Sequence, residues 1–298
     1  MDTQVLYNIV HQGAFGLNIA IYFYLTGLSA GSFILSTLAY GFGMKQFKPI
    51  GRVGIILATL LLIIAPFFLL IHIGMPFRAW HLFVYLNWSS PITWGSFLLL
   101  LYPINCIVYG YFMFKENLRL TRVFALIGIP LAVSVHGYTG FILAFGKARP
   151  LWNTALMPLL FLVSAVVSGI ALMIIVYMIK SRFFSREKKI NRELVFSLSK
   201  LLAWVIVFDL FLVGCDLIVL SISHSDAQAV AHLILQGKYS LMFLLIENFL
   251  GKIVPFFLLV VPRFRTLTTV TVASILVVIG IFFMRYVVVV AGEFLPLL

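Results

Sequence analysis

Residues 155–179 read ALMPLLFLVSAVVSGIALMIIVYMI, a stretch without a single charged side chain. An apolar run of about 18 residues or more can cross the hydrocarbon core of a bilayer, which is about 30 Å thick. The whole chain of 298 residues has the same character, with 63% hydrophobic residues, 10% charged residues and a mean hydropathy of +1.13. Soluble domains carry about 25% charged residues, so this composition excludes a soluble enzyme, a disordered protein and a fibrous repeat.

Seven further apolar runs accompany this one. The eight candidate spans are residues 14–41, 51–73, 92–113, 123–145, 155–179, 198–222, 239–261 and 267–292. Lipid offers no hydrogen-bond partner to backbone N–H and C=O groups, so each span must be a helix. The connections between the spans are too short and too charged to fold alone. We therefore predict an all-α integral membrane protein, in which residues 1–298 form one polytopic domain of eight transmembrane helices.

The basic residues indicate how these helices are oriented. The chain has 21 Lys and Arg against 9 Asp and Glu, a net charge of +12. Fifteen basic residues follow the odd-numbered spans: Lys45, Lys48, Arg52, Lys115, Arg119, Arg122, Lys180, Arg182, Arg186, Lys188, Lys189, Arg192, Lys200, Arg263 and Arg265. The loops after the even-numbered spans hold four: Arg78, Lys147, Arg149 and Lys238. Basic loops stay in the cytoplasm, which predicts an N-out/C-out topology.

The densest basic run, residues 180–192, has two possible interpretations. In a soluble protein it would suggest binding to nucleic acid. Between two membrane spans it is a topology signal that also contacts anionic lipid, and we favour this second interpretation.

The two cysteines, Cys106 and Cys215, both lie inside apolar spans. The sequence contains no CxxC motif and no cluster of Cys and His residues. A structural zinc site and an iron–sulfur cluster both need such ligand spacing. We therefore expect no metal site in this chain.

Polar and aromatic residues gather in the loops of the predicted outer side. The residues concerned are Arg78, Trp80, His81, Trp88, Trp94, Arg149, Trp152 and Asn153. An interfacial aromatic belt would explain the tryptophans alone. It would not explain why proline turns, asparagine and arginine accompany them on one side only. A docking surface for a partner protein, with a ligand site beneath it, explains the whole set better.

Four motifs carry a resemblance to a known family. They are YFYLTGLSAG at residues 22–31, SSPITWGS at 89–96, YTGF at 138–141 and ARPLWN at 148–153. In this order they resemble the membrane subunits of polysulfide reductase and of nitrite-reductase-associated quinol dehydrogenases, the NrfD/PsrC type. Each motif alone is weak, whereas the ordered set is specific, and the resemblance extends over the eight-helix pattern.

The resemblance implies a fold, a cofactor and partners. The fold is a pair of four-helix bundles, residues 1–150 with a quinone site and residues 151–298 with buried charges. The cofactor is menaquinone, bound near the outer face without haem. The partners are a periplasmic, ferredoxin-like subunit with four iron–sulfur clusters and a molybdopterin catalytic subunit. Such complexes lie in the cytoplasmic (inner) membrane of bacteria or archaea.

The resemblance covers the family's quinone ligands only in part. The tyrosine ligand of polysulfide reductase falls on Tyr138, but its histidine ligand falls on Tyr22, and its asparagine falls one place from Asn18. An Asp-Leu-Gly-Arg-Pro stretch common in the family appears here as HIGMP at residues 72–76.

The residues themselves also point to a quinone site. A quinone needs hydrogen-bonding groups at its two carbonyl oxygens, a path for protons and an apolar slot for its tail. Five hydrogen-bonding residues converge at one predicted depth near the outer face: Asn18, Tyr22, His72, His136 and Tyr138. Histidine exchanges protons near neutral pH, while tyrosine and asparagine can position carbonyl groups.

Each of these residues also has a plainer interpretation. The tyrosines are compatible with an interfacial belt, and the histidines with hydrogen bonding between helices. His72 and His136 could also form a bis-histidine haem site, which we disfavour because no second pair exists to carry electrons across the membrane.

Charged residues in the last three spans form a separate group: Asp209, Asp216, Glu247, Lys252 and Arg285. Ionisable groups inside a membrane are costly and usually paired. The structural interpretation is two neutralising pairs, Asp209–Lys252 and Glu247 or Asp216 with Arg285. The functional interpretation is a proton route between the cytoplasm and the quinone site.

Three function classes follow from these features. The leading one is a quinone-reactive membrane anchor of a respiratory oxidoreductase, which has no catalytic residue of its own and no complete reaction without its partners. The alternative is an ion-coupled secondary transporter that uses the buried charges. No inverted repeat is visible, and the polar residues gather near one face, which counts against transport. A purely structural anchor would not need the His, Tyr and Asn cluster.

Overall fold

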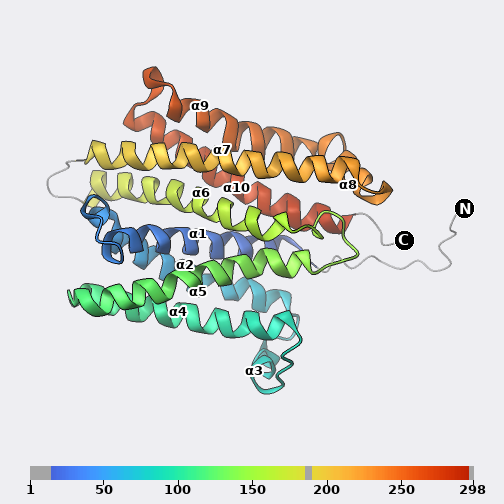
Figure 1. Cartoon of the computed structure of the whole chain (residues 1–298), viewed down its shortest axis with the longest axis horizontal. Helices are drawn as coiled ribbons and strands as arrows, with labels where there is room; N and C mark the ends of the chain where they lie inside the picture. Colours follow the sequence, from blue (N-terminus) through green and yellow to red (C-terminus); the bar gives the residue numbers. More distant parts are fainter. Residues whose placement is uncertain (1–14, 185–189, 295–298) are drawn as a thin grey trace, which may run out of the picture.

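The computed structural model describes residues 15–184 and 190–294, and within these ranges all regular structure is helical (Figure 1). Among these described residues, eight helical stretches are long and apolar enough to cross a membrane. They comprise α1 (Leu17–Tyr40), α2 (Lys48–His72), α4 (Pro91–Phe114), α5 (Leu118–Ala144), α6 (Leu156–Ile179), α7 (Arg192–Ile222), η4 (Leu241–Ile253) continued by α9 (Val254–Val260), and α10 (Leu267–Phe294). This confirms the predicted all-α fold with eight spans.

Short helices make most of the connections. They are η1 (Lys45–Phe47), η2 (Pro76–Arg78), α3 (His81–Val84), η3 (Lys180–Phe184), α8 (Ser225–Leu235) and η5 (Pro262–Phe264). None of them is long enough to span a bilayer.

Two spans begin at least five residues earlier than predicted. α5 starts at Leu118 and α7 at Arg192, whereas the apolar pattern places the starts at residues 123 and 198. The side chains of Asn117 and Asn191 explain both starts, because each accepts a hydrogen bond from the backbone N–H three residues later, at 3.2 and 3.1 Å. Such N-caps stabilise a helix start, so the basic residues that follow them lie on helices and not in loops.

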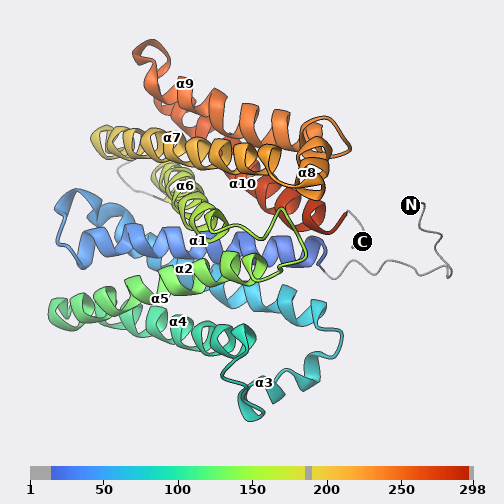
Figure 2. The ribbon, with the colours of Figure 1, turned by 45° about the vertical axis from the view of Figure 1, so that its right-hand side comes forward.

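The first four spans lie on one side of the molecule and the last four on the other (Figures 1 and 2). α1 and α6 contact each other where the two sides meet. The division into two separate four-helix bundles and the outward orientation of the termini stay predictions.

Small residues allow the close contact between α1 and α6. A Cβ atom on Gly31 would overlap the carbonyl oxygen of Ala165 and lie 2.8 Å from the Cα atom of Gly169. Helices in lipid associate through such small residues, which let their backbones approach. This close approach of the two backbones explains the glycine at position 31 of the 22–31 motif.

We expect Gly31→Ala to destabilise the protein, by about 1–3 kcal/mol if it acts as an ordinary overpacking substitution. Gly137→Ala is the matched control, because a Cβ atom there would meet only the Leu162 side chain, at an ordinary 3.7 Å. Thermal unfolding of the purified complex in detergent measures both. Equal unfolding temperatures of the two variants would contradict the role of Gly31.

Both ends of the described chain lie at the same end of the bundle. The backbone N–H of Phe15 lies 2.9 and 3.0 Å from the two carboxylate oxygens of Glu293. We call this end, which also carries α3 and α8 (Figure 1), the termini end. An even number of spans requires this arrangement.

The opposite end, which we call the basic end, carries the described basic residues that follow the odd-numbered spans. Here Arg52 pairs with Glu116 at 2.9 Å, and Arg122 donates a hydrogen bond to the carbonyl of Gly41 at 3.0 Å. Arg186, Lys188 and Lys189 of the 180–192 run lie outside the described residues.

Candidate functional site

A cavity of about 560 Å³ lies at the termini end, among α1, α2, α4 and α5. We call it the tyrosine cavity. Tyr22, His72 and Tyr138, three of the five predicted quinone ligands, line it from three different helices. The remaining lining is mostly apolar, with Ile19, Leu69, Leu99 and Ile142 among its side chains. The structure therefore brings together residues that are far apart in the sequence.

The position of Tyr138 depends on a glycine of the 89–96 motif. A Cβ atom on Gly95 would overlap the ring and hydroxyl of Tyr138. The missing side chain thus lets the phenol lie directly against α4. Neither the Tyr138 hydroxyl nor the Tyr22 hydroxyl bonds to another group among the described residues, so both remain available to a ligand.

Two residues that we predicted as docking residues, Arg78 and His81, also line the tyrosine cavity. The η2 turn and the α3 helix after His72 fold the loop over the cavity mouth. The His72 ring stacks on Phe15, with 5.8 Å between ring centroids. The sequence offers one signal for this fold-back, a proline turn at Pro76 directly after the span.

The other two predicted ligands, Asn18 and His136, do not line the cavity. Asn18 is half-buried on α1. His136 is fully buried, and its Nε2 atom lies 2.8 Å from the Phe161 carbonyl oxygen and 3.1 Å from Nη2 of Arg285. His136 and His72 therefore do not share one site, as a bis-histidine haem would require.

The predicted docking residues divide into exposed and buried ones. Trp80, Trp88 and Trp94 are exposed, and Trp94 donates a hydrogen bond from Nε1 to the Trp88 carbonyl at 3.0 Å. Asn153 is exposed as well, whereas Arg149 is half-buried and donates to the Glu293 carbonyl at 3.2 Å.

The prediction that Trp152 belongs to the docking surface is wrong. Its side chain is only 4% exposed, and its Nε1 atom donates to the Val288 carbonyl at 2.7 Å. The indole fits because Gly292 has no side chain, and a Cβ atom there would overlap it. Trp152 therefore joins the loop after α5 to α10 in the interior.

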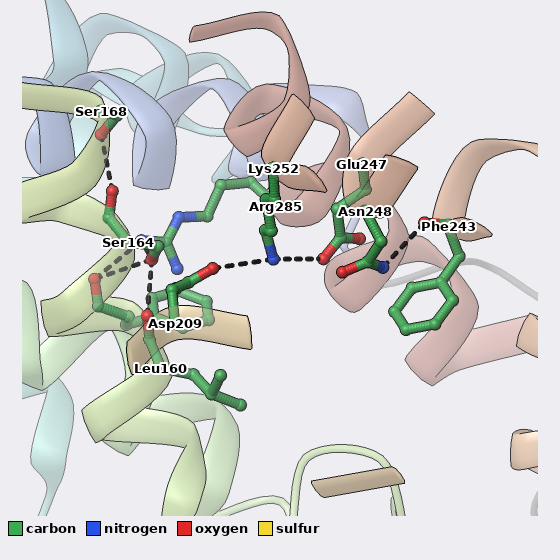
Figure 3. Close-up of polar contacts among 10 residues, drawn as sticks. Leu160, Ser164, Ser168, Asp209, Phe243, Glu247, Asn248, Lys252 and Arg285 are labelled. Atoms are coloured by element: carbon green, nitrogen blue, oxygen red, sulfur yellow. Dashed lines mark hydrogen bonds and ion pairs between the residues drawn. The ribbon is translucent and has the colours of Figure 1, made fainter. Parts of the chain in front are cut away.

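A second site lies inside the other half of the molecule. The Nζ atom of Lys252 lies 2.8 Å from a carboxylate oxygen of Asp209 and 3.0 Å from Oε1 of Glu247 (Figure 3). We call these three residues the ion cluster. All three side chains are at most 2% exposed. The predicted Asp209–Lys252 pair is therefore present, with Glu247 as a second partner of the same lysine.

The backbone of η4 makes this double pairing possible. η4 is a π-helix of 13 residues, in which residues five apart lie one turn apart. Glu247 and Lys252 therefore share one face. A π-helix also places Gly251 against Gly280 of α10, where a Cβ atom on Gly251 would lie 2.5 Å from the Cα atom of its neighbour. Long π-helices are rare and often mark functional sites.

The predicted pairing of Arg285 with Glu247 or Asp216 is wrong. Nη2 of Arg285 instead lies 2.6 Å from Oγ of Ser164 (Figure 3). The same atom lies 2.9 Å from the Phe161 carbonyl oxygen. The guanidinium also lies over the Phe161 ring, 3.7 Å from its centroid. Arg285 thus connects α10 to α6, a contact that no sequence pattern indicated.

Comparisons with known proteins agree with these features. The sequence profile described as "Polysulphide reductase, NrfD" matches residues 7–296. A selenate reductase subunit from Mesobacillus selenatarsenatis is 31% identical, with 95% of this chain and 75% of that protein covered. The integral membrane subunit of an Hdr-like menaquinol oxidoreductase from Archaeoglobus fulgidus is 29% identical, with 92% of this chain and 69% of that protein covered. A polysulfide reductase chain from Wolinella succinogenes is 29% identical, with 65% of this chain and 66% of that protein covered.

The eight spans, the ordered motifs and a profile match over nearly the whole length lead to one assignment. This chain belongs to the NrfD polysulphide reductase family.

Proposed function

We propose that this chain is the quinone-reactive membrane subunit of a respiratory oxidoreductase complex. It would exchange electrons between menaquinone or menaquinol and an iron–sulfur subunit docked at the termini end. The observation that carries this proposal is the tyrosine cavity, about 560 Å³ of mostly apolar space with Tyr22, His72 and Tyr138 in its wall.

The residues of the cavity fit a quinone. Ligand sites for apolar cofactors typically combine an apolar lining with a few placed polar groups. The two phenol hydroxyls can donate hydrogen bonds to carbonyl oxygens, and the imidazole nitrogens of His72 can donate or accept one. The aliphatic lining residues would hold the ring and the first part of the tail.

A bound quinone would supply two-electron, two-proton redox chemistry. The chain itself would bind and orient the ring through the hydroxyls of Tyr22 and Tyr138. His72 would move protons between the cavity and the surrounding water. Arg78 and His81, which also line the cavity, would limit the access of water and keep the mouth electropositive.

The names of the relatives support the rest of the proposal. They are subunits of a selenate reductase, a menaquinol oxidoreductase and a polysulfide reductase. We infer that a periplasmic iron–sulfur subunit and a molybdopterin catalytic subunit complete the reaction. The exposed Trp80, Trp88 and Trp94 beside the cavity mouth would form part of the docking surface.

The distribution of charge supports a location. If basic loops stay in the cytoplasm, the basic end faces the cytoplasm of a bacterium or archaeon and the termini end faces the periplasm. The tyrosine cavity would then open just under the periplasmic surface. Proton translocation through the ion cluster would be an additional property of the complex.

Analysis of the purified complex tests the proposal. We expect menaquinone to be retained, without the absorption bands of haem. Leu99→Trp should reduce the retained quinone, because Leu99 lines the cavity and the indole would fill part of it. Leu100→Trp is the matched control, since Leu100 follows on the same helix, points outward and is 47% exposed. A complex without quinone, or equal retention in the two variants, would contradict the proposal.

A further inference from the structure

Two cavities in the half of the molecule that contains the ion cluster share Asp216 in their lining. The larger, which we call the vestibule, has about 340 Å³ and opens at the termini end. Its polar lining includes Lys147, Asn153, Thr154, His224 and Asp226. The smaller, which we call the inner cavity, has about 30 Å³.

The inner cavity lies between Asp216 and the ion cluster. Its lining includes Val213, Asp216, Phe243 and Glu247. By the same measure of volume, a water molecule needs about 10–15 Å³ and two or more polar partners. The inner cavity is therefore large enough for water.

Two polar atoms at this cavity have no hydrogen-bond partner among the described residues. They are Oδ1 of Asp216 and Oε2 of Glu247, and both are buried. Buried polar groups nearly always have a partner, either protein or ordered water. Water in the inner cavity would supply the missing partner to both carboxylates at once.

We propose that Asp216 links the vestibule to the ion cluster, so that Glu247 exchanges protons with water at the termini end. A proton would arrive through the vestibule, pass Asp216 and the water in the inner cavity, and bind Oε2 of Glu247. Lys252 would then keep Asp209 as its charged partner. The same proton would leave by the reverse route.

Buried apolar side chains lie beyond the ion cluster in the direction of the basic end. Leu202 and Ile206 continue the Asp209 face of α7 toward the basic end, and Val277 lies on the Arg285 face of α10. All three are fully buried. The cavity toward the basic end, of about 450 Å³, has no residue of the ion cluster in its lining, whereas the inner cavity has Glu247. The proposed exchange therefore uses the termini end, and the sequence-based route from the cytoplasm stays a hypothesis. The vestibule and the inner cavity share no residue with the tyrosine cavity.

This inference deepens the proposed function, because it gives the side from which the buried charges exchange protons. Its test does not depend on quinone turnover. Single cysteines would be introduced into the full complex, in a background where Cys215 is replaced by Ser. Cys106, which is fully buried, would remain as an internal reference, and modification would be assigned by peptide mass spectrometry.

Two probes of different size would distinguish the vestibule from the inner cavity. A charged, membrane-impermeant methanethiosulfonate, added from the side of the termini end, should modify Asp216→Cys. Silver ion, which is about as small as water, should bind the thiol of Val213→Cys so that no free thiol remains. The methanethiosulfonate should leave this thiol unmodified. Ile206→Cys should keep its thiol with both probes, as Cys106 should.

Three outcomes would overturn the inference. The first is a Val213→Cys thiol that silver does not reach although Asp216→Cys reacts. The second is a reaction of Val213→Cys only from the basic end, and the third is an equal reaction of Ile206→Cys. Bound quinone would be measured in the same preparations. If quinone is retained while Val213→Cys stays unreactive, this inference fails and the quinone proposal stands.

Discussion

The double variant Tyr22→Phe/Tyr138→Phe should oxidise menaquinol with a strongly reduced kcat/KM. Each substitution removes a hydroxyl that we expect to donate a hydrogen bond to a quinone oxygen inside the mostly apolar tyrosine cavity. A buried acceptor left without its donor costs about 1–3 kcal/mol, and about 1.4 kcal/mol corresponds to a tenfold change. We therefore expect a loss of about 5- to 140-fold for each hydroxyl.

The measurement needs to separate the cavity from the rest of the complex. Menaquinol oxidation would be compared with the reaction of a reduced viologen dye, which delivers electrons to the catalytic partner directly and should be unaffected. Tyr24→Phe is the matched control on the same helix, because the Tyr24 hydroxyl donates to the Val278 carbonyl at 2.8 Å and does not line the cavity. An unchanged kcat/KM in the double variant would exclude both tyrosines as quinone ligands.

The sequence predicted which helices surround the tyrosine cavity better than which residues face it. Depth along a helix follows from residue number and the loop positions, so Tyr22, His72 and Tyr138 are placed correctly at one end. Residue number and loop positions do not give the direction in which a side chain points into the bundle. His136 and Tyr138 are two residues apart, and residues at this spacing do not face the same way, so both could not line one cavity.

The buried charges show a different limit. The number of charges and their approximate depth follow from the sequence, and so does the Asp209–Lys252 pair. The second pairing failed because the prediction assumed α-helical geometry in the seventh span. In an α-helix, residues five apart diverge, whereas the π-helical turns of η4 bring Glu247 onto the face of Lys252. Arg285 donates hydrogen bonds to Ser164 and to the Phe161 carbonyl. Both partners are uncharged, so the pattern of charged residues in the sequence could not predict them.

Lys252→Met should prevent stable assembly of the protein. Lys252 is the shared cation of two buried carboxylates, 2.8 and 3.0 Å away. Removing one partner of a buried ion pair costs about 3–5 kcal/mol, because an uncompensated charge stays in the interior. This is a large part of the about 5–15 kcal/mol that stabilises a typical folded protein. We expect little protein in the membrane and a strongly lowered unfolding temperature.

Arg52→Met is the control for this prediction. Arg52 also pairs with a carboxylate, that of Glu116, at 2.9 Å, but its side chain is 47% exposed. Exposed ion pairs contribute little to stability, so this variant should unfold like the wild type. If Lys252→Met and Arg52→Met were equally stable, the ion cluster would not need its lysine.

A triple variant separates the structural role of the ion cluster from proton exchange. Asp209→Asn/Glu247→Gln/Lys252→Met removes all three charges at nearly constant volume, and replacing a whole buried ion pair by neutral groups is often close to neutral for stability. We expect this variant to assemble where Lys252→Met alone does not. If the ion cluster also exchanges protons during turnover, the assembled triple variant should oxidise menaquinol more slowly and change the number of protons released per electron. If both quantities equal those of the wild type, the three charges serve stability alone, because the variant keeps the packing of this region and lacks only its titratable groups.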